Sequence, residues 1–273
     1  MLTKTQLIYR HALPIRLTHW INVLCLIFLL MSGLQIFNAH PELYFGNRSD
    51  PDRSVLALDA RQEPDGAIKG VTRIGNRSFD TTGVLGASRG ANGDLEARGF
   101  PSWITVPSYR DLATGRRWHF FFAWLFVLNG LVYLAYSIAS GHIRRDLVPG
   151  WTQIKGIGHD IYQHIRLRFP QGEEARHYNV LQKLAYLAVV LGLLPLVVLT
   201  GLTMSPAIDA AFPFLLDIFG GRQSARTIHF LCAWGIVLFV IVHVVMVLIS
   251  GVWNNLRSMI TGRYRISEAA NEP

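Results

Sequence analysis

Residues 227–255 form a long apolar stretch without a charged side chain, and this stretch restricts the possible folds most. At about 1.5 Å per residue, a helix of this length crosses the ~30 Å hydrocarbon core of a bilayer. The stretch contains two histidines, His229 and His243, which lie fourteen positions apart. Fourteen steps of about 100° return to within about 40° of the starting direction, so both imidazoles share one helix face about 21 Å apart. Ionisable groups inside a membrane helix are candidates for a functional site.

Three further stretches, 17–37, 118–140 and 184–208, also lack charged residues, and each is long enough to span a bilayer. The chain is 51% hydrophobic, with a mean hydropathy of +0.28, which is too apolar for an ordinary soluble domain. We therefore expect an all-α membrane protein, a four-helix transmembrane bundle that forms one domain over residues 1–273. The first stretch is longer than the apolar region of a signal peptide, so it is expected to remain as a helix. Gly192 and Pro195 should bend the third helix.

The charged residues predict the topology. Lys and Arg number three in residues 1–16, six in 141–177 and three in 256–273, against two in the short connection 209–226. The positive-inside rule then places both termini in the cytoplasm of a bacterial inner membrane. The long polar connection 38–117 would be periplasmic, with a hairpin of strands Ser54–Ala60 and Ala67–Ile74 around the turn sequence Glu-Pro-Asp-Gly.

This topology gives each histidine of the fourth stretch a partner at its own depth. His119 begins the second stretch and pairs with His229 on the periplasmic side, whereas His19 begins the first and pairs with His243 on the cytoplasmic side. Two histidines bind haem iron and leave no open position, which favours electron transfer over oxygen chemistry. The pattern therefore predicts two haem b groups. Proton relays and metal transporters would be expected to have carboxylates in the spans, which contain no Asp or Glu.

Other residues fit packing around a haem. Gly33 lies fourteen positions after His19, where a glycine would let the macrocycle approach the backbone, and Gly130 and Gly201 are further candidates for the same role. Close packing between helices is an equal alternative for these glycines. Several arginines lie within a turn of a candidate ligand and are candidates to pair with the haem propionates, although interfacial anchoring would also explain them: Arg16, Arg116, Arg117 and Arg226.

The remaining histidines lie outside the four stretches, and we expect them at the surface: His11, His40, His142, His159, His164 and His177. Cys25 and Cys232 lie within apolar stretches and are expected to be small buried side chains. The sequence contains no Cys-x-x-Cys-His, so covalent haem attachment is excluded.

Short motifs in or beside the four apolar stretches can be compared with known families: R-L-T-H-W, G-R-R-W-H-F, Y-N-V-L-Q-K-L-A-Y, T-G-L-T-M-S-P and R-T-I-H-F. These motifs resemble the prokaryotic cytochrome b-561 superfamily, which includes the cytochrome b subunits of nickel–iron hydrogenases, formate dehydrogenases and thiosulfate reductases. The resemblance covers the four helices. It implies that His19, His119, His229 and His243 hold two haems, and that quinone lies near His19 and His243. Hydrogenase-type subunits often have a fifth helix, which this chain lacks.

The expected function is electron transfer between membrane quinone and a periplasmic oxidoreductase partner, either molybdopterin-dependent or a hydrogenase. The chain would act as a subunit of that complex rather than as a catalyst alone. Its basic residues flank the apolar stretches, so nucleic acid is not an expected partner. Two alternatives remain: a membrane transporter or channel without haem, and an anchor whose haems are only structural.

Overall fold

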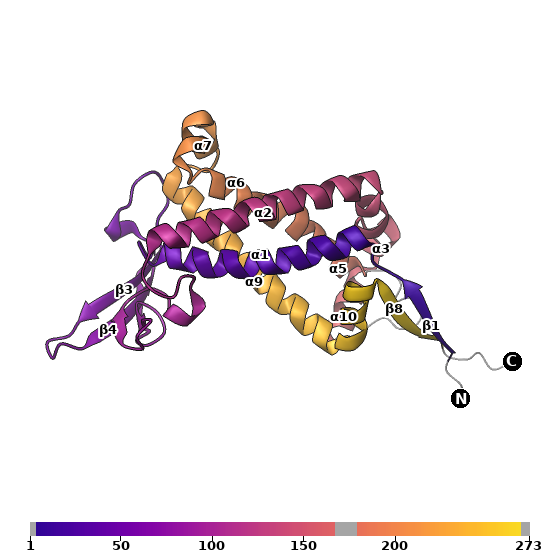
Figure 1. Cartoon of the computed structure of the whole chain (residues 1–273), viewed down its shortest axis with the longest axis horizontal. Coiled ribbons are helices and arrows are strands. Elements are labelled where there is room, and N and C mark those ends of the chain that lie inside the picture. The colour runs from indigo at the N-terminus through magenta and orange to yellow at the C-terminus, as the bar shows by residue number, and fades with distance from the viewer. Residues whose placement is uncertain (1–3, 167–178, 269–273) are drawn as a thin grey trace. The chain divides into compact units, whose positions relative to one another are not determined.

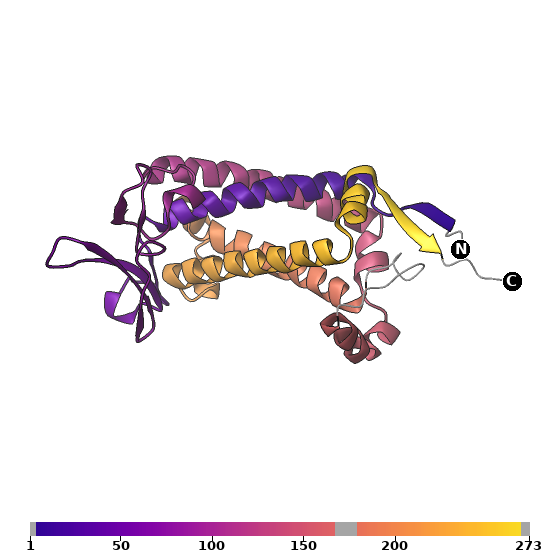
Figure 2. The same cartoon turned by 90° about the horizontal axis from the view of Figure 1, so that it is seen from below.

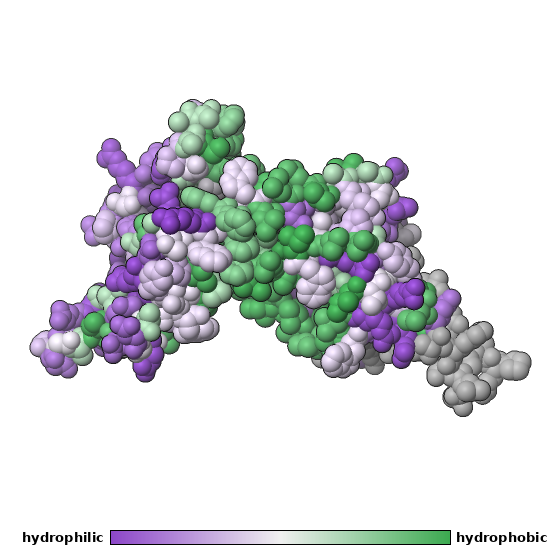
Figure 3. Space-filling view, viewed as in Figure 1, coloured by the Kyte–Doolittle hydropathy of each residue, from purple (hydrophilic) through white to green (hydrophobic). Residues whose placement is uncertain are grey.

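The computed structural model describes residues 4–166 and 179–268 (Figure 1). In this part of the chain, four helical segments are long and apolar enough to cross a membrane: α1 (Leu13–Phe37), α2 (Leu112–Ala139), the segment Val180–Leu202, and α9 (Arg222–Ile249). The fold is therefore the expected helical membrane type. Hydrophobic side chains cover much of the helical surface (Figure 3), because lipid rather than water is the solvent there.

The helix boundaries differ from the predicted ones. Helix α2 begins at Leu112, before its arginines, because Asp111 caps it: Thr114 donates its backbone N–H and its hydroxyl to the Asp111 carboxylate, at 3.0 and 2.7 Å. These hydrogen bonds also lower the pKa of Asp111. At the other end of the chain, α9 stops at Ile249, and Gly251 with φ 109° starts the separate helix α10 (Val252–Thr261).

The third span is not a uniform helix. It consists of α5 (Val180–Leu187), a π-helical turn (Ala188–Leu193) and α6 (Leu194–Leu202). Pro195 has no N–H to donate, and a π-helical turn is one way in which a helix adjusts next to such a gap. The irregularity falls where the sequence predicted a bend. The span ends six residues earlier than expected, and α7 (Pro206–Ala211) follows it.

The residues group by contact into two compact units, which we describe separately. The first unit comprises residues 1–21, 128–195 and 234–273. In it, strand β1 (Lys4–Tyr9) pairs antiparallel with β8 (Arg263–Glu268), the indigo and yellow arrows of Figure 2, with Tyr9 opposite Arg263. Gly262, with φ 80°, turns the chain from α10 into β8, and a Cβ there would lie 2.7 Å from the Tyr9 ring. This unit also contains the short helices α3 (Trp151–Lys155) and α4 (Ile157–Ile165).

The second unit comprises residues 22–127 and 196–233. Its long connection folds as a four-stranded antiparallel sheet in the order β2 (Glu42–Leu43), β3 (Leu56–Gln62), β4 (Ile68–Ile74) and β5 (Arg77–Asp80). The two strands β6 (Ala87–Arg89) and β7 (Leu95–Ala97) form a second hairpin. The predicted hairpin is confirmed as β3–β4, whose turn uses Gly66 at φ 83°. A short helix, α8 (Phe214–Ile218), precedes α9.

A hydrophobic core fastens this connection to the end of α1. Buried side chains of the helix pack against buried side chains of the strands and the chain that follows them: Leu34, Phe37, Leu43, Leu58 and Phe100. Burying a side chain of this size contributes about 1.5–3 kcal/mol. The connection is therefore part of the second unit rather than a loose linker.

Candidate functional site

Two of the predicted histidine ligands meet in the first unit. The ring centroids of His19, on α1, and His243, on α9, lie 6.3 Å apart with the ring planes inclined by 64°. We call these two residues the termini-side pair. Phe239 stacks on the His243 ring at 5.9 Å, and the Tyr186 ring meets it edge-on at 6.4 Å. Aromatic side chains therefore enclose one side of this pair.

The helix that carries His19 is held by bonds from the residues on either side of that histidine. Asn129 of α2 donates its side-chain amide to the Thr18 carbonyl at 2.8 Å. Trp20 donates its indole N–H to the Met259 carbonyl of α10 at 3.1 Å. Both contacts flank His19, so they hold this turn of α1 against α2 and α10.

The other two predicted ligands meet in the second unit. The ring centroids of His119, on α2, and His229, on α9, also lie 6.3 Å apart with the planes inclined by 64°. We call these residues the loop-side pair. The two pairs thus share one separation and one inclination, and they are the pairs that topology predicted.

Each histidine of the loop-side pair rests on a hydroxyl residue followed by a glycine. The Ser32 hydroxyl lies 3.1 Å from His119 Nδ1, and a Cβ on Gly33 would lie 3.4 Å from His119 Cε1. The Thr200 hydroxyl lies 3.3 Å from His229 Nδ1, and a Cβ on Gly201 would lie 3.3 Å from His229 Cε1. The glycines therefore leave room for the imidazoles, and the hydroxyls orient them.

The hydrogen bonds of the loop-side pair select the tautomer. His229 Nδ1 lies 2.9 Å from the carbonyl oxygen of Val197, which can only accept, so Nδ1 carries the proton. The Ser32 hydroxyl donates to the Phe28 carbonyl, so it accepts from His119 Nδ1, 3.1 Å away. In both rings Nε2 is then the nitrogen available to a metal, and partners of this kind are typical of metal-binding histidines.

The separation of the rings fits one iron between each pair. Imidazole nitrogens bind first-row metals at about 2 Å, so two rings on opposite sides of one ion have their bound nitrogens about 4 Å apart. With ring bonds near 1.3–1.4 Å, each ring centre lies about 1 Å further away, which gives a centroid separation of about 6 Å. Both pairs match this value at 6.3 Å.

Two imidazoles are also the number that a haem needs. A metal ion bound only by side chains usually has three or four of them, and residues 4–166 and 179–268 contain no such group of three or more His, Cys, Asp or Glu. The porphyrin supplies four nitrogens to its iron, which leaves two axial positions for protein ligands. The residues present therefore fit two haems.

Of the arginines considered for the propionates, Arg16 has an unused donor. Its Nη1 donates to the Ile260 carbonyl, whereas its Nε is buried and has no hydrogen-bond partner among the described residues. An anionic propionate beside His19 would satisfy that N–H. Arg117 is exposed on the first turns of α2, and the neighbouring Arg116 lies over the Phe120 ring at 5.6 Å.

Arg226 has a different set of contacts. Its two terminal nitrogens donate to the carbonyls of Glu42, at 2.7 Å, and His40, and its guanidinium lies 5.3 Å from the centroid of the Phe37 ring. It thus joins α9 to the start of the long connection. A propionate contact from Arg226 stays a prediction.

The structure corrects the prediction for two of the other histidines. His11 is buried rather than exposed, packed beside Gly262 at the end of α10, and His142 is half-buried with Nδ1 2.7 Å from the Asp146 carboxylate. His40 and His159 are exposed as expected. The His164 side chain and His177 lie outside the described part of the chain. Cys25 and Cys232 are buried, as predicted.

Sequence reasoning overlooked the residues that support the ligands. Ser32 and Thr200 each precede a glycine inside an apolar span, and this repeated pattern was the available signal. Gly130 was expected to resemble Gly33 and Gly201, but an added Cβ there meets no atom within 4 Å among the described residues. Asn129, which holds the Thr18 carbonyl, has no distinctive sequence context.

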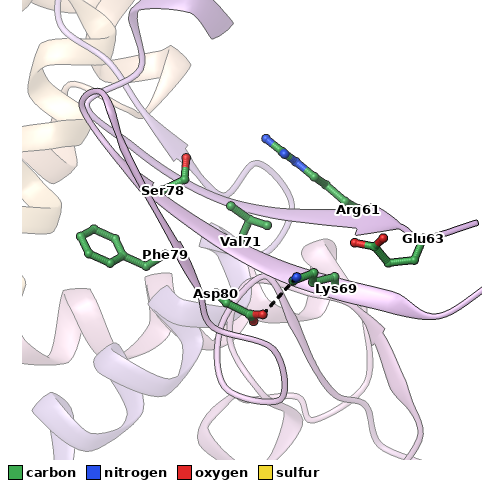
Figure 4. A pocket seen from close by; sticks show the side chains of 7 residues that line it. All are labelled: Arg61, Glu63, Lys69, Val71, Ser78, Phe79 and Asp80. Carbon is green, nitrogen blue, oxygen red and sulfur yellow. Dashed lines mark ion pairs between the residues drawn. The ribbon is translucent and has the colours of Figure 1, made fainter.

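A pocket of about 230 Å³ lies elsewhere in the second unit, on the face of the β3–β4–β5 sheet (Figure 4). Charged side chains surround it, including Lys69 and Asp80, which form an ion pair at 3.4 Å, and Arg61 and Glu63. No histidine lines this pocket, so it is separate from both pairs.

Comparisons with known proteins agree with the geometry. The family model described as prokaryotic cytochrome b561 matches residues 10–262. A protein of Azospira oryzae, named as a candidate protein-methionine-sulfoxide reductase subunit YedZ1, is 27% identical over 233 residues, which cover 85% of this chain and 87% of the relative. No solved structure matches the chain. With the family model covering nearly the whole sequence, the chain belongs to the prokaryotic cytochrome b561 family of membrane proteins, which bind b-type haem and transport electrons.

Proposed function

We propose that this chain is a di-haem cytochrome b of the bacterial inner membrane that transfers electrons between membrane quinone and a periplasmic oxidoreductase. The observation that supports it most is the presence of two histidine pairs with the same ring separation, 6.3 Å, and the same inclination, 64°. His19 and His243 would hold one haem, and His119 and His229 the other. Haem supplies reversible one-electron chemistry when bound.

The residues around each pair have defined roles in this proposal. Ser32, Thr200 and the Val197 carbonyl bond to Nδ1 of the loop-side imidazoles and so leave Nε2 available to hold a haem iron. Asn129 and Trp20 hold the backbone on either side of His19. Two histidines on one haem would leave no open position for oxygen, so these residues favour electron transfer.

The proposed orientation rests on charge. The segments 1–16, 141–177 and 256–273 carry twelve Lys and Arg against two in 209–226, which supports a cytoplasmic location of both termini and of the termini-side pair. The connections 38–117 and 209–226 are then periplasmic and form the docking surface for the partner. Quinone would be bound from the membrane near His19 and His243, as the family resemblance implies.

The partner is proposed from the relative's name. That name, a protein-methionine-sulfoxide reductase subunit, suggests that the partner of this chain is an enzyme that reduces oxidised methionine. Converting a sulfoxide to a thioether consumes two electrons and two protons and releases water, and oxidation of one quinol to quinone releases two electrons and two protons. With a reductase as partner, electrons flow from quinol through this chain to the periplasm. The chain itself is an electron carrier, and catalysis belongs to the partner.

A membrane transporter or channel is the competing function. It would need polar side chains along a path through the spans, and all four spans lack Asp and Glu between residues 17–37, 118–140, 184–208 and 227–255. Membership of a cytochrome family favours the electron carrier.

Absorbance and haem content of the purified protein test the proposal. We expect a b-type alpha band in the reduced-minus-oxidised spectrum and two haems per chain. Quinol added to membranes should reduce both haems, which separates an electron carrier from an anchor with structural haems. A protein without an alpha band, or one whose haems quinol does not reduce, would contradict the proposal.

A further inference from the structure

Arg98 is a buried arginine in the second unit that no proposed ligand contact uses. Its side chain has 0% exposure, and it follows strand β7 in the long connection. Its donors bond to the Phe100 carbonyl at 2.8 Å, to Gln35 Oε1 at 2.9 Å and to the Thr105 hydroxyl at 2.7 Å. Burying a guanidinium costs free energy unless its donors are satisfied, and here they are.

The Arg98 guanidinium is connected to the loop-side pair through side chains of α1. Gln35 accepts a hydrogen bond from Arg98. It lies three residues after Ser32, so these two residues of α1 are about 4.5 Å apart along the helix axis. Ser32 in turn contacts His119. Gly115, one turn before His119, packs on the same glutamine, since its Cβ position lies 3.0 Å from Gln35 Cγ. Gln35 therefore lies between the guanidinium and the helix turn that carries His119.

The charge of Arg98 is only partly compensated by its acidic neighbour. Glu96 Oε1 lies 3.4 Å from Arg98 Nη1, but the glutamate side chain is 37% exposed whereas the arginine is fully buried. Water screens the exposed carboxylate more strongly than the buried guanidinium. A net positive potential thus acts on the protein interior at the end of α1.

We propose that Arg98 is a positioning residue that raises the reduction potential of the haem held by His119 and His229. A positive charge disfavours the ferric state, which carries one more positive charge than the ferrous state, and the low dielectric of the buried site strengthens the effect. Arg98 acts through charge and through Gln35, without touching the ligands. This inference rests on the proposed function, because it needs a haem at the loop-side pair.

Potentiometric titration of single-haem protein tests the inference. In a His243→Ala background only the loop-side haem should remain, so its midpoint potential can be read from the alpha band. Arg98→Gln should lower that potential, whereas Arg98→Lys, which keeps the charge, should leave it near the original value. Arg89→Gln is the matched control, because Arg89 is an exposed arginine of the same connection whose charge water screens.

A second variant decides the question if Arg98→Gln fails to fold. Glu96→Gln removes the compensating carboxylate and leaves the buried guanidinium in place, so it should raise the potential. An unchanged potential in both Arg98→Gln and Glu96→Gln would overturn the inference, as would an equal fall in Arg98→Gln and Arg98→Lys. Absence of any haem in the His243→Ala protein would instead contradict the proposed function.

Discussion

The imidazole of His229 donates Nδ1–H to the carbonyl oxygen of Val197, 2.9 Å away on the neighbouring span. That carbonyl lies four residues before Gly201, in the segment α6, which follows the π-helical turn. The bond ties a proposed axial ligand to the third span, which contains no histidine itself. The third span thus contributes to the loop-side site without contributing a ligand to iron.

Removing one ligand at a time should separate the two proposed haems. His243→Ala is expected to lose the termini-side haem and retain the loop-side one, and His229→Ala to do the reverse, because each pair lies within its own unit. Haem content should fall from two to about one per chain in each variant. Pyridine haemochrome assay and low-temperature spectra measure this. Full haem content in either variant would refute the pairing.

A larger side chain at Gly201 should remove the loop-side haem. In Gly201→Val the first added carbon lies 3.3 Å from His229 Cε1, and the branched methyl groups require still more room. The imidazole would then leave its bond to Val197. Gly130→Val is the matched control within a span, since a Cβ there meets nothing within 4 Å among the described residues. We expect a single-haem spectrum for Gly201→Val and an unchanged spectrum for Gly130→Val.

Acid should destabilise the first unit through His11. Burial, with a smaller contribution from Arg10, lowers the pKa of His11 from 6.5 to about 4. The unfolded chain therefore binds a proton more readily than the folded one between these values, so stability falls as the pH drops from about 6.5 to about 4. The loss should be roughly 3 kcal/mol. Thermal unfolding in detergent at several pH values measures it, and His11→Gln should flatten this part of the profile.

Loss of the Asn38 amide should loosen the long connection. Asn38 is buried and forms two hydrogen bonds with Phe100, accepting from its N–H at 2.7 Å and donating to its carbonyl at 3.2 Å. Asn38→Ala leaves a buried N–H without a partner, which should cost about 2 kcal/mol. Limited proteolysis of residues 40–110 should then be roughly 30-fold faster. The exposed Gln62→Ala serves as control, and equal cleavage of both variants would count against the role of Asn38.

Cysteine labelling tests the proposed orientation. Ala91→Cys, in the long connection, should react with a membrane-impermeant maleimide in intact spheroplasts, whereas Lys155→Cys should react only after permeabilisation. The wild-type protein is the background, because Cys25 and Cys232 are 0% and 5% exposed and should stay unlabelled. The reverse labelling pattern would invert the topology.

The sequence predicted the helices and the histidine pairs because both follow from simple rules. Few uncharged stretches are long enough for a helix to cross the bilayer core, so the spans can be recognised. The positive-inside rule then orients the spans, and the orientation gives each histidine a depth in the membrane. The pairing of His19 with His243 needs only this reasoning, and the structure brings the two rings together. The ends of the spans were harder to predict, because Asp111 and Gly251 act as local signals that hydropathy does not register.

The support for the ligands could not be predicted in the same way. Gln35 and Arg98 meet across 63 positions of sequence, and their contact depends on how the strands of the connection fold. Short strands such as β6 and β7 have three residues each, too few for an alternating pattern to be recognised. His11, which follows β1, was expected at the surface because the sequences of β1 and β8 do not reveal that these two strands pair.

The first turns of α9 hold residues 40–46 through their backbone. Thr227 donates to the Tyr44 carbonyl, Arg226 to those of His40 and Glu42, and Ser224 accepts from the Gly46 N–H. Backbone groups are the same whichever side chains the segment carries. The exposed positions of this segment can therefore diverge during evolution, and adapt to a different partner, while the helix keeps the same attachment.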